Sequence, residues 1–81
     1  MLNIFTTPIL IIIKELLELD HNESLKIEYK NNIDYEFLRY HDVIVVYLNG
    51  RFKRVISQCT EYSIRWNIEE LREPASNLSL G

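Results

Sequence analysis

The side chains of this sequence that could do chemistry are few and stand far apart in the chain. Cys59 is the candidate nucleophile, and His21 and His41 are the candidate general bases. A thiol becomes reactive when a base or a positive charge beside it favours the thiolate, and no catalytic motif surrounds these three residues. A lone cysteine among apolar neighbours is more typical of a small core residue. We therefore expect Cys59 to be structural.

Metal and phosphate chemistry find equally little support. The pair His41-Asp42 also occurs in metal-dependent phosphohydrolases, but those sites need further histidines and aspartates, and this chain has one other histidine. Between two predicted strands the pair is better explained as turn chemistry. Two glycines are too few for a phosphate-binding loop. Paired carboxylates fall on helix faces predicted to meet water: Glu15 with Glu18, and Glu69 with Glu70. We expect no enzyme, no metal and no cofactor.

Composition indicates one small intracellular domain. The chain has 81 residues, 47% of them hydrophobic, which suits a single core, and its one cysteine cannot form an internal disulfide. No signal-like segment and no apolar run long enough for a membrane span is seen, so we expect a cytoplasmic protein. Frequent isoleucine and asparagine are associated with AT-rich genomes, including those of phages and mobile elements.

The charges are unevenly distributed along the chain. Residues 1–36 hold seven acids and three bases, whereas residues 37–66 hold two acids and five bases, together with most of the aromatic residues. This basic and aromatic central segment is the one asymmetry in the sequence that suggests a function.

A helix is predicted over residues 8–20, with Thr7 as its N-cap and Pro8 at its first position. An apolar stripe at helical spacing would face the core. Leu10, Ile11 and Leu19 widen this stripe, either as a deeper core contact or as a surface for self-association. The isoleucine run also leaves a strand assignment open.

Four strands are predicted next. Alternation marks residues 25–30 and 34–40, and a three-residue loop over 31–33 would place Tyr29 opposite Tyr35, whereas a two-residue turn at 31–32 would not. The apolar run 43–48 predicts a central strand buried on both faces.

A type I′ turn at Asn49-Gly50 would begin the next hairpin. Its register would place Phe52 opposite Tyr47, Lys53 opposite Val46 and Arg54 opposite Val45, with Phe52 in the core.

The segment 57–72 is compatible with two assignments. The alternation of Tyr62, Ile64 and Trp66 with polar residues favours a fifth strand, although a helical stripe also fits. Asn67 and Glu70 resemble a capping box for a short helix that Pro74 would end.

The predicted fold is thus α+β: an N-terminal helix packed on a four- or five-stranded antiparallel sheet, with a short C-terminal helix or turn. Residues 1–74 would form a single domain and residues 75–81 a flexible tail. The predicted core comprises Ile9, Ile12, Ile13, Leu16, Ile27, Tyr29, Phe37, Val43, Val45, Phe52, Ile56 and Ile64.

Binding is the class of function that this pattern favours. We expect a small non-catalytic protein-binding module, an adaptor, inhibitor or immunity-type protein, whose partner is another protein or a second copy of itself. The alternative is RNA or DNA binding through the basic and aromatic region 37–66, which the acidic remainder of the chain opposes. The predicted partner-binding residues are Arg39, Tyr40, Arg51, Lys53, Arg54, Arg65 and Trp66.

Overall fold

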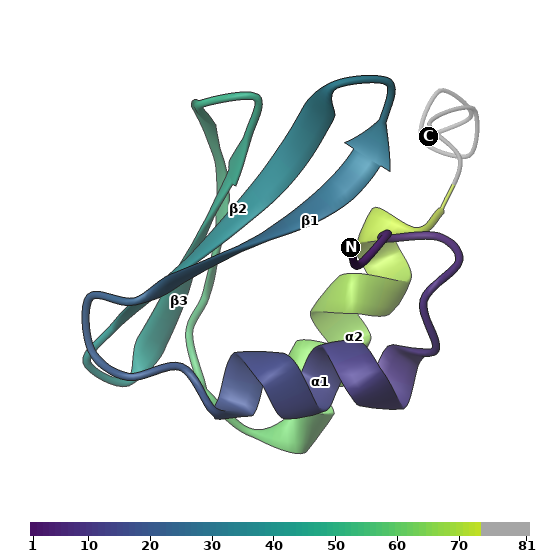
Figure 1. The fold of residues 1–81 in the computed structure, drawn as a ribbon. Helices are drawn as coiled ribbons and strands as arrows, with labels where there is room; N and C mark the ends of the chain where they lie inside the picture. Colours follow the sequence, from purple (N-terminus) through teal and green to yellow (C-terminus); the bar gives the residue numbers. More distant parts are fainter. Residues whose placement is uncertain (74–81) are drawn as a thin grey trace, which may run out of the picture.

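The computed structural model describes residues 1–73 and confirms an α+β fold (Figure 1). The chain forms a helix, a four-stranded antiparallel sheet and a second helix, and the strands follow one another in the sheet in chain order. The elements are α1 (Ile9–Leu17), β1 (Ser24–Lys30), β2 (Ile33–Tyr40), β3 (Val43–Leu48), β4 (Arg51–Ile56) and α2 (Glu61–Leu71). The predicted tail 75–81 lies outside the described residues.

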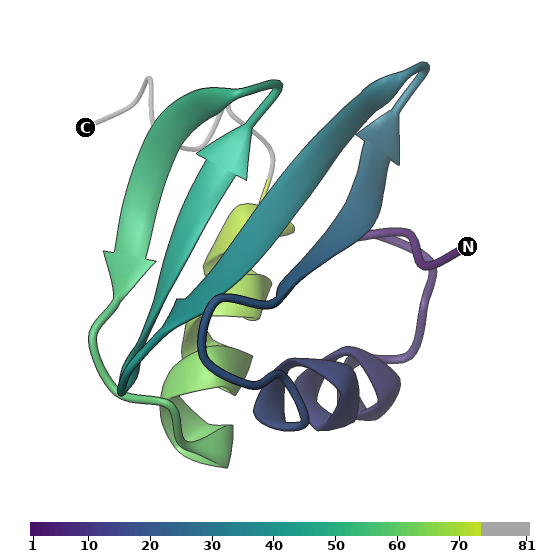
Figure 2. The same cartoon turned by 60° about the vertical axis from the view of Figure 1, so that its left-hand side comes forward.

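Both helices lie on the same side of the sheet, and the core fills the space between the two layers (Figures 1 and 2). Most of the predicted core is confirmed, while Ile9 and Tyr29 are half-buried against it. Val43, Val45 and Phe52 do not pack against this core, so the prediction for these three was wrong. The buried apolar residues are Ile4, Ile12, Ile13, Leu16, Ile27, Tyr35, Phe37, Ile44, Val46, Ile56, Ile64, Ile68 and Leu71.

Residues 61–71 form a helix, and the preferred strand assignment was wrong. Thr60 caps the helix through its hydroxyl, which accepts a hydrogen bond from the Ser63 amide at 3.2 Å. The buried positions Ile64, Ile68 and Leu71 recur at helical spacing. The predicted capping box was also wrong, since Asn67 is buried in the interior of α2.

α1 is shorter than predicted. Pro8 occupies the N-cap position without a side-chain cap, and the Thr7 hydroxyl instead accepts a hydrogen bond from the Asn3 amide at 2.7 Å. Leu17 is the last residue of α1, three residues before the predicted end. Thr7 therefore stabilises the turn that precedes the helix rather than the helix itself.

The first hairpin has the turn that was rejected and a register that was not predicted. Residues 31–32 form a two-residue turn in which Asn32 has a positive φ of 60°. A bulge between Glu28 and Lys30 then shifts the pairing, so that Ile27 lies opposite Tyr35. One extra residue in β1 thus places both side chains in the core without the three-residue loop.

The second hairpin was predicted correctly at its turn and wrongly beyond it. Asn49 and Gly50 have φ values of 52° and 81°, and Tyr47 lies opposite Phe52. A bulge at Lys53 then sets Arg54 opposite Val46. The extra residue reverses the inside–outside alternation, which turns Arg54 towards the helices and leaves Phe52 on the other side.

Residues 2–4 run beside β1 and cover its edge. The Ile4 amide donates to the Glu28 carbonyl at 2.7 Å, and the Glu28 amide donates to the Leu2 carbonyl at 2.8 Å. The Arg72 guanidinium holds this segment against the end of α2 through the carbonyls of Ile4 and Thr7. Neither helix of the described chain has the length and apolar content needed to cross a membrane.

Candidate binding surface

Three of the predicted partner-binding arginines are engaged within the chain itself. Arg39 donates to the carbonyls of His41 and Leu19 and so joins two loops. Arg54 bonds two side chains of α2, and Arg65 forms an i,i+4 ion pair with Glu61 at 3.3 Å. These guanidinium groups have structural partners, so their presence does not by itself require an external ligand.

The other predicted partner-binding residues are exposed but lie on separate parts of the molecule. Tyr40 is at the end of β2, and Arg51 and Lys53 are at the opposite end of the sheet beside the β3–β4 turn. Trp66 lies on α2 and is 53% exposed. The structure does not bring the basic and aromatic residues of region 37–66 onto one surface.

The predicted self-association residues also differ in their surroundings. Leu10 and Ile11 are exposed on α1, whereas Leu19 is half-buried against the core. Leu10 and Ile11 are therefore accessible, but Leu19 serves the core.

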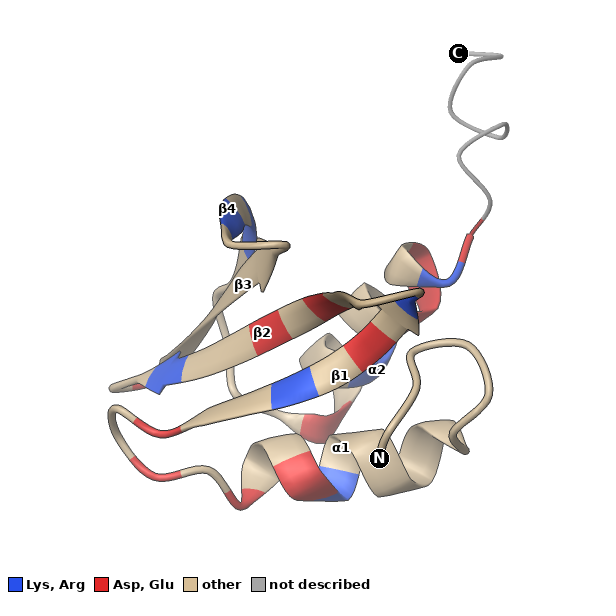
Figure 3. Ribbon diagram, turned by 45° about the horizontal axis from the view of Figure 1, so that its top comes forward, with Lys and Arg blue, Asp and Glu red and all other residues tan. Residues whose placement is uncertain are grey.

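The sheet has a second face, which neither helix covers and which we call the outer face (Figure 3). Its rows follow from the register: Glu28 lies opposite Asp34, and the next row runs Lys26, Glu36, Tyr47 and Phe52. The following rows place Ser24 beside Leu38, Val45 and Val55, and Tyr40 beside Val43. These twelve side chains alternate along each strand with residues that face the helices.

An apolar patch occupies most of the outer face. On an antiparallel sheet that has one face towards water, the water-facing positions are usually polar. Here they include Phe52, which is 64% exposed, together with Val55 and Tyr40, which are nearly half exposed. The remaining members are half-buried between their neighbours. The apolar patch comprises Leu38, Tyr40, Val43, Val45, Tyr47, Phe52 and Val55.

An acidic corner adjoins this patch where β1 and β2 approach their turn (Figure 3). We define it by Glu28, Asp34 and Glu36, against which the outer face carries the one base Lys26. The two ion pairs of the described chain, both of which involve arginines, include neither Asp34 nor Glu36. The acidic corner therefore retains an excess of negative charge beside the apolar patch.

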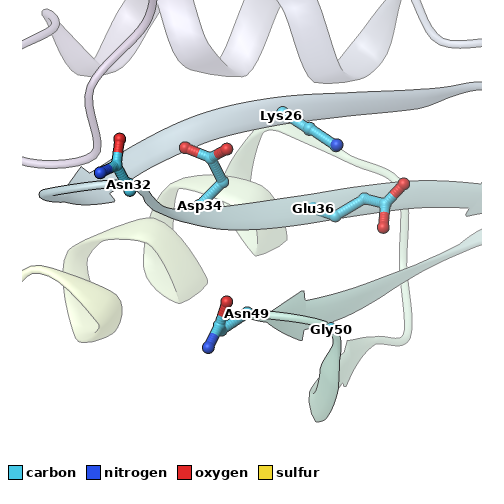
Figure 4. Close-up of a pocket in the computed structure, with 6 residues that line it drawn as sticks. All are labelled: Lys26, Asn32, Asp34, Glu36, Asn49 and Gly50. Carbon is cyan, nitrogen blue, oxygen red and sulfur yellow. The ribbon is translucent and has the colours of Figure 1, made fainter.

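A polar hollow of about 300 Å³ lies within this corner, between the turns of the two hairpins (Figure 4). Asp34, Glu36 and Lys26 line it from β1 and β2, and Asn32 and Asn49 line it from the turns. The Asn49 amide donates to the Asp34 carbonyl at 3.0 Å and holds the two hairpins together there. The hollow is suited to a cationic side chain, because its lining carries two carboxylates and one ammonium group.

The two edges of the sheet differ in how they are covered. Residues 2–4 cover β1, whereas β4 has no neighbour within residues 1–73. The bulge at Lys53 and the charge of that residue are both features that discourage the addition of another strand. The charge of Lys53 therefore has a structural role, which is to protect the open β4 edge.

The candidate nucleophile and the candidate general bases, Cys59, His21 and His41, make structural contacts. Cys59 packs against the core. The rings of His21 and His41 stack with centroids 4.3 Å apart, and Nδ1 of His21 accepts the His41 amide at 3.0 Å. No group of three metal-ligating side chains gathers among residues 1–73. Burial raises the pKa of the Tyr35 phenol, with a further contribution from Tyr29.

Sequence reasoning missed the outer face as a surface, although a signal was present. The run 43–48 is apolar at both alternating sets of positions, which was interpreted as burial on both faces by the protein's own helices. The helices cover the face of Ile44 and Val46 alone. The other apolar set, Val43, Val45 and Tyr47, is the centre of the apolar patch.

Comparisons of the chain with protein-family models, with curated protein sequences and with solved structures find no match.

Proposed function

We propose that this protein is a non-catalytic protein-binding module and that the outer face of its sheet is the docking surface. The observation that carries this proposal is the apolar patch on a face that neither helix covers. A contiguous exposed apolar patch with a polar border is typical of an interaction site. Docking would remove Phe52 and Val55 from water, which favours association through the hydrophobic effect.

The arrangement of the patch also fits the general form of a protein interface. Its centre contains apolar and aromatic side chains, and its border carries the charged groups of the acidic corner. Tyr47 and Phe52 lie opposite each other in the sheet, so two aromatic side chains are neighbours on the outer face. Aromatic residues near the centre of an interface frequently contribute most of its binding energy.

RNA or DNA binding is less well supported by this arrangement. A nucleic-acid platform needs exposed aromatic side chains and bases on the same face. The aromatic residues of the outer face lie beside three carboxylates and one lysine, and Arg39, Arg54 and Arg65 are engaged within the chain. Carboxylates would repel phosphate groups at this surface.

Site-specific photocrosslinking in the cells that naturally make the protein tests the proposal. A photoreactive phenylalanine analogue replaces Phe52 on the outer face or, as a matched control, Tyr62 on α2, which is 79% exposed. We expect protein adducts from position 52 that the added substitution Val55→Ser reduces, and none of the same mass from position 62. Adducts that ribonuclease or deoxyribonuclease removes, or equal adducts from both positions, would overturn the proposal.

A further inference from the structure

We infer that the partner presents a basic amphipathic helix to the outer face, with its apolar stripe on the apolar patch and lysine or arginine side chains over the acidic corner. This inference rests on the proposed function and names the chemistry of the partner. It combines three observations: the position of the acidic corner, the polar hollow within it, and the orientation of the chain's own bases.

The acidic corner lies beside the apolar patch and not within it. Glu36 is directly opposite Tyr47 in the register, and Asp34 is one row nearer to the turns. A helix laid along β3 would place its apolar stripe on Tyr47 and Val45. One flank of that helix would then pass over β2, where Asp34 and Glu36 would meet its side chains. Cationic residues along that flank are the complementary choice.

The polar hollow gives these cationic residues a place to bind. Figure 4 shows that Asp34 and Glu36 project from β2, with Lys26 on the neighbouring strand. Its volume of about 300 Å³ is larger than a lysine or arginine side chain needs, so one such group can enter with water around it. A guanidinium or ammonium group there would offset the excess of negative charge.

A second copy of the chain fits this surface poorly. Two outer faces placed together would bring two acidic corners into one interface, each with one lysine. The bases of the second hairpin would not compensate, because Arg51 is paired with Leu48 in a row that faces the helices. Lys53 lines a hollow on the helix side together with Tyr35 and Glu70. Like charges brought together disfavour an interface.

A helix is also a better occupant than an added strand. The β4 edge carries a bulge and Lys53, which hinder strand addition. The apolar patch extends over three strands, and it is broad enough for a helix to lie across it. An amphipathic helix docks on such a surface through residues spaced at i, i+3, i+4 and i+7.

Two synthetic peptides of the same length test the inference on the full chain. Both carry one leucine stripe at helical spacing, and their polar positions are all lysine in one and all glutamate in the other. Binding is followed by changes in the backbone amide NMR signals of the ¹⁵N-labelled protein at low salt. We expect the lysine peptide to shift signals of β2, β3 and β4 and to bind at least about tenfold more tightly than the glutamate peptide.

The double variant Asp34→Asn with Glu36→Gln should lower the affinity for the lysine peptide by roughly three- to tenfold. The matched control, Glu15→Gln with Glu18→Gln, removes the same charge from α1 and should leave binding unchanged. Equal loss in both variants would mean non-specific attraction to a negatively charged protein and would overturn the inference. Signal shifts on the helices alone would also overturn it.

The two proposals can fail separately. Equal binding of both peptides to the outer face would contradict the inference of a basic partner, while the proposal of a protein-docking surface would stand. If neither peptide shifts signals of the outer face, the helix inference fails, whereas the photocrosslinking result still decides the docking surface.

Discussion

The Arg54 guanidinium of β4 donates to the side-chain carbonyl of Asn67 in the middle of α2, with a nitrogen–oxygen distance of 3.0 Å. The Asn67 amide nitrogen in turn donates to the Ser63 carbonyl at 2.8 Å, so both ends of this buried side chain are satisfied. The same guanidinium also reaches Glu70 at 2.6 Å. A base that the sequence suggests as a partner contact therefore joins the last strand to the last described helix.

The first prediction concerns this contact. Arg54→Ala should lower the free energy of unfolding by about 1–3 kcal/mol, because it leaves the buried Asn67 carbonyl without a partner. Arg51→Ala, an exposed neighbour on the same strand, should change it by less than about 0.5 kcal/mol. Denaturant unfolding of both variants provides the measurement. Equal effects would show that Arg54 contributes no more than a surface charge.

The second prediction separates the two faces of the sheet. Phe52→Ser should cost less than about 1 kcal/mol, since Phe52 is 64% exposed and lies opposite Tyr47 on the outer face. Phe37→Ala should cost about 3–5 kcal/mol, because Phe37 is fully buried. Thermal or denaturant unfolding distinguishes them. A large loss in Phe52→Ser would place Phe52 in a core and remove it from the docking surface.

The third prediction concerns the segment that covers β1. Arg72→Ala removes the guanidinium bonds to the carbonyls of Ile4 and Thr7 and should cost about 1.5–3 kcal/mol. Hydrogen exchange at the amides of Ile4 and Glu28 should accelerate more than at the amides of β3. Arg65→Ala, which breaks an exposed pair within α2, serves as the control, with an expected cost of about 0.3–0.5 kcal/mol. Unchanged exchange at Ile4 would contradict this account of Arg72.

The fourth prediction is a loss of stability at alkaline pH. Burial raises the pKa of the Tyr35 phenol above its ordinary value of 10.0, with Tyr29 adding to the effect and Arg54 opposing it. The unfolded chain then releases this proton at lower pH than the folded chain. The contribution of Tyr35 is full below about pH 10 and is lost as the pH rises towards the folded-state pKa.

Unfolding experiments between about pH 8 and pH 11 test this sign. Tyr35→Phe should remove part of the alkaline loss of stability, whereas Tyr62→Phe should not, because Tyr62 is 79% exposed. The comparison is of slopes against pH, since Tyr35→Phe also changes the stability at neutral pH. Parallel slopes for the wild type and Tyr35→Phe would show that the Tyr35 phenol has the same pKa in both states.

The strands and the turn at Asn49-Gly50 could be predicted because their signals are local. Asn49-Gly50 requires positive φ, and the structure has it at both residues. The two bulges could not be predicted, since each depends on which side chains the core accepts across several strands. The bulge at Lys53 turns Arg54 towards α2, whereas Phe52 is exposed because its partner Tyr47 lies on the face of β3 that the helices do not cover.

The segment 57–72 shows why a periodic pattern can mislead. Tyr62, Ile64 and Trp66 alternate as in a strand, but Ile64, Ile68 and Leu71 also lie on one face of a helix. Packing decides between the two patterns, because the helix buries two isoleucines and a leucine and leaves the two large aromatic residues at the surface. The Thr60 cap was the local signal that could have favoured the helix.

The exposure of the outer face is also decided by packing and not by the local sequence. The apolar residues of the outer face can be seen in the sequence. Which face of the sheet the helices cover depends on the number and position of the helices. The predicted site was one stretch of chain, 37–66, whereas the outer face is a surface assembled from all four strands. Its acidic corner arises from β1 and β2, whose carboxylates had been assigned to the acidic half of the chain.

The contact between Arg72 and Ile4 affects the order in which the chain can fold during translation. The two residues are 68 positions apart, whereas the strands pair with their neighbours in chain order. The hairpins can form as soon as their residues leave the exit tunnel. The bond from Arg72 to the Ile4 carbonyl can form only after α2 has emerged, so residues 2–4 cover β1 without this support until then. We expect the β1 edge to be more open to wrong strand pairing during this interval than in the finished fold.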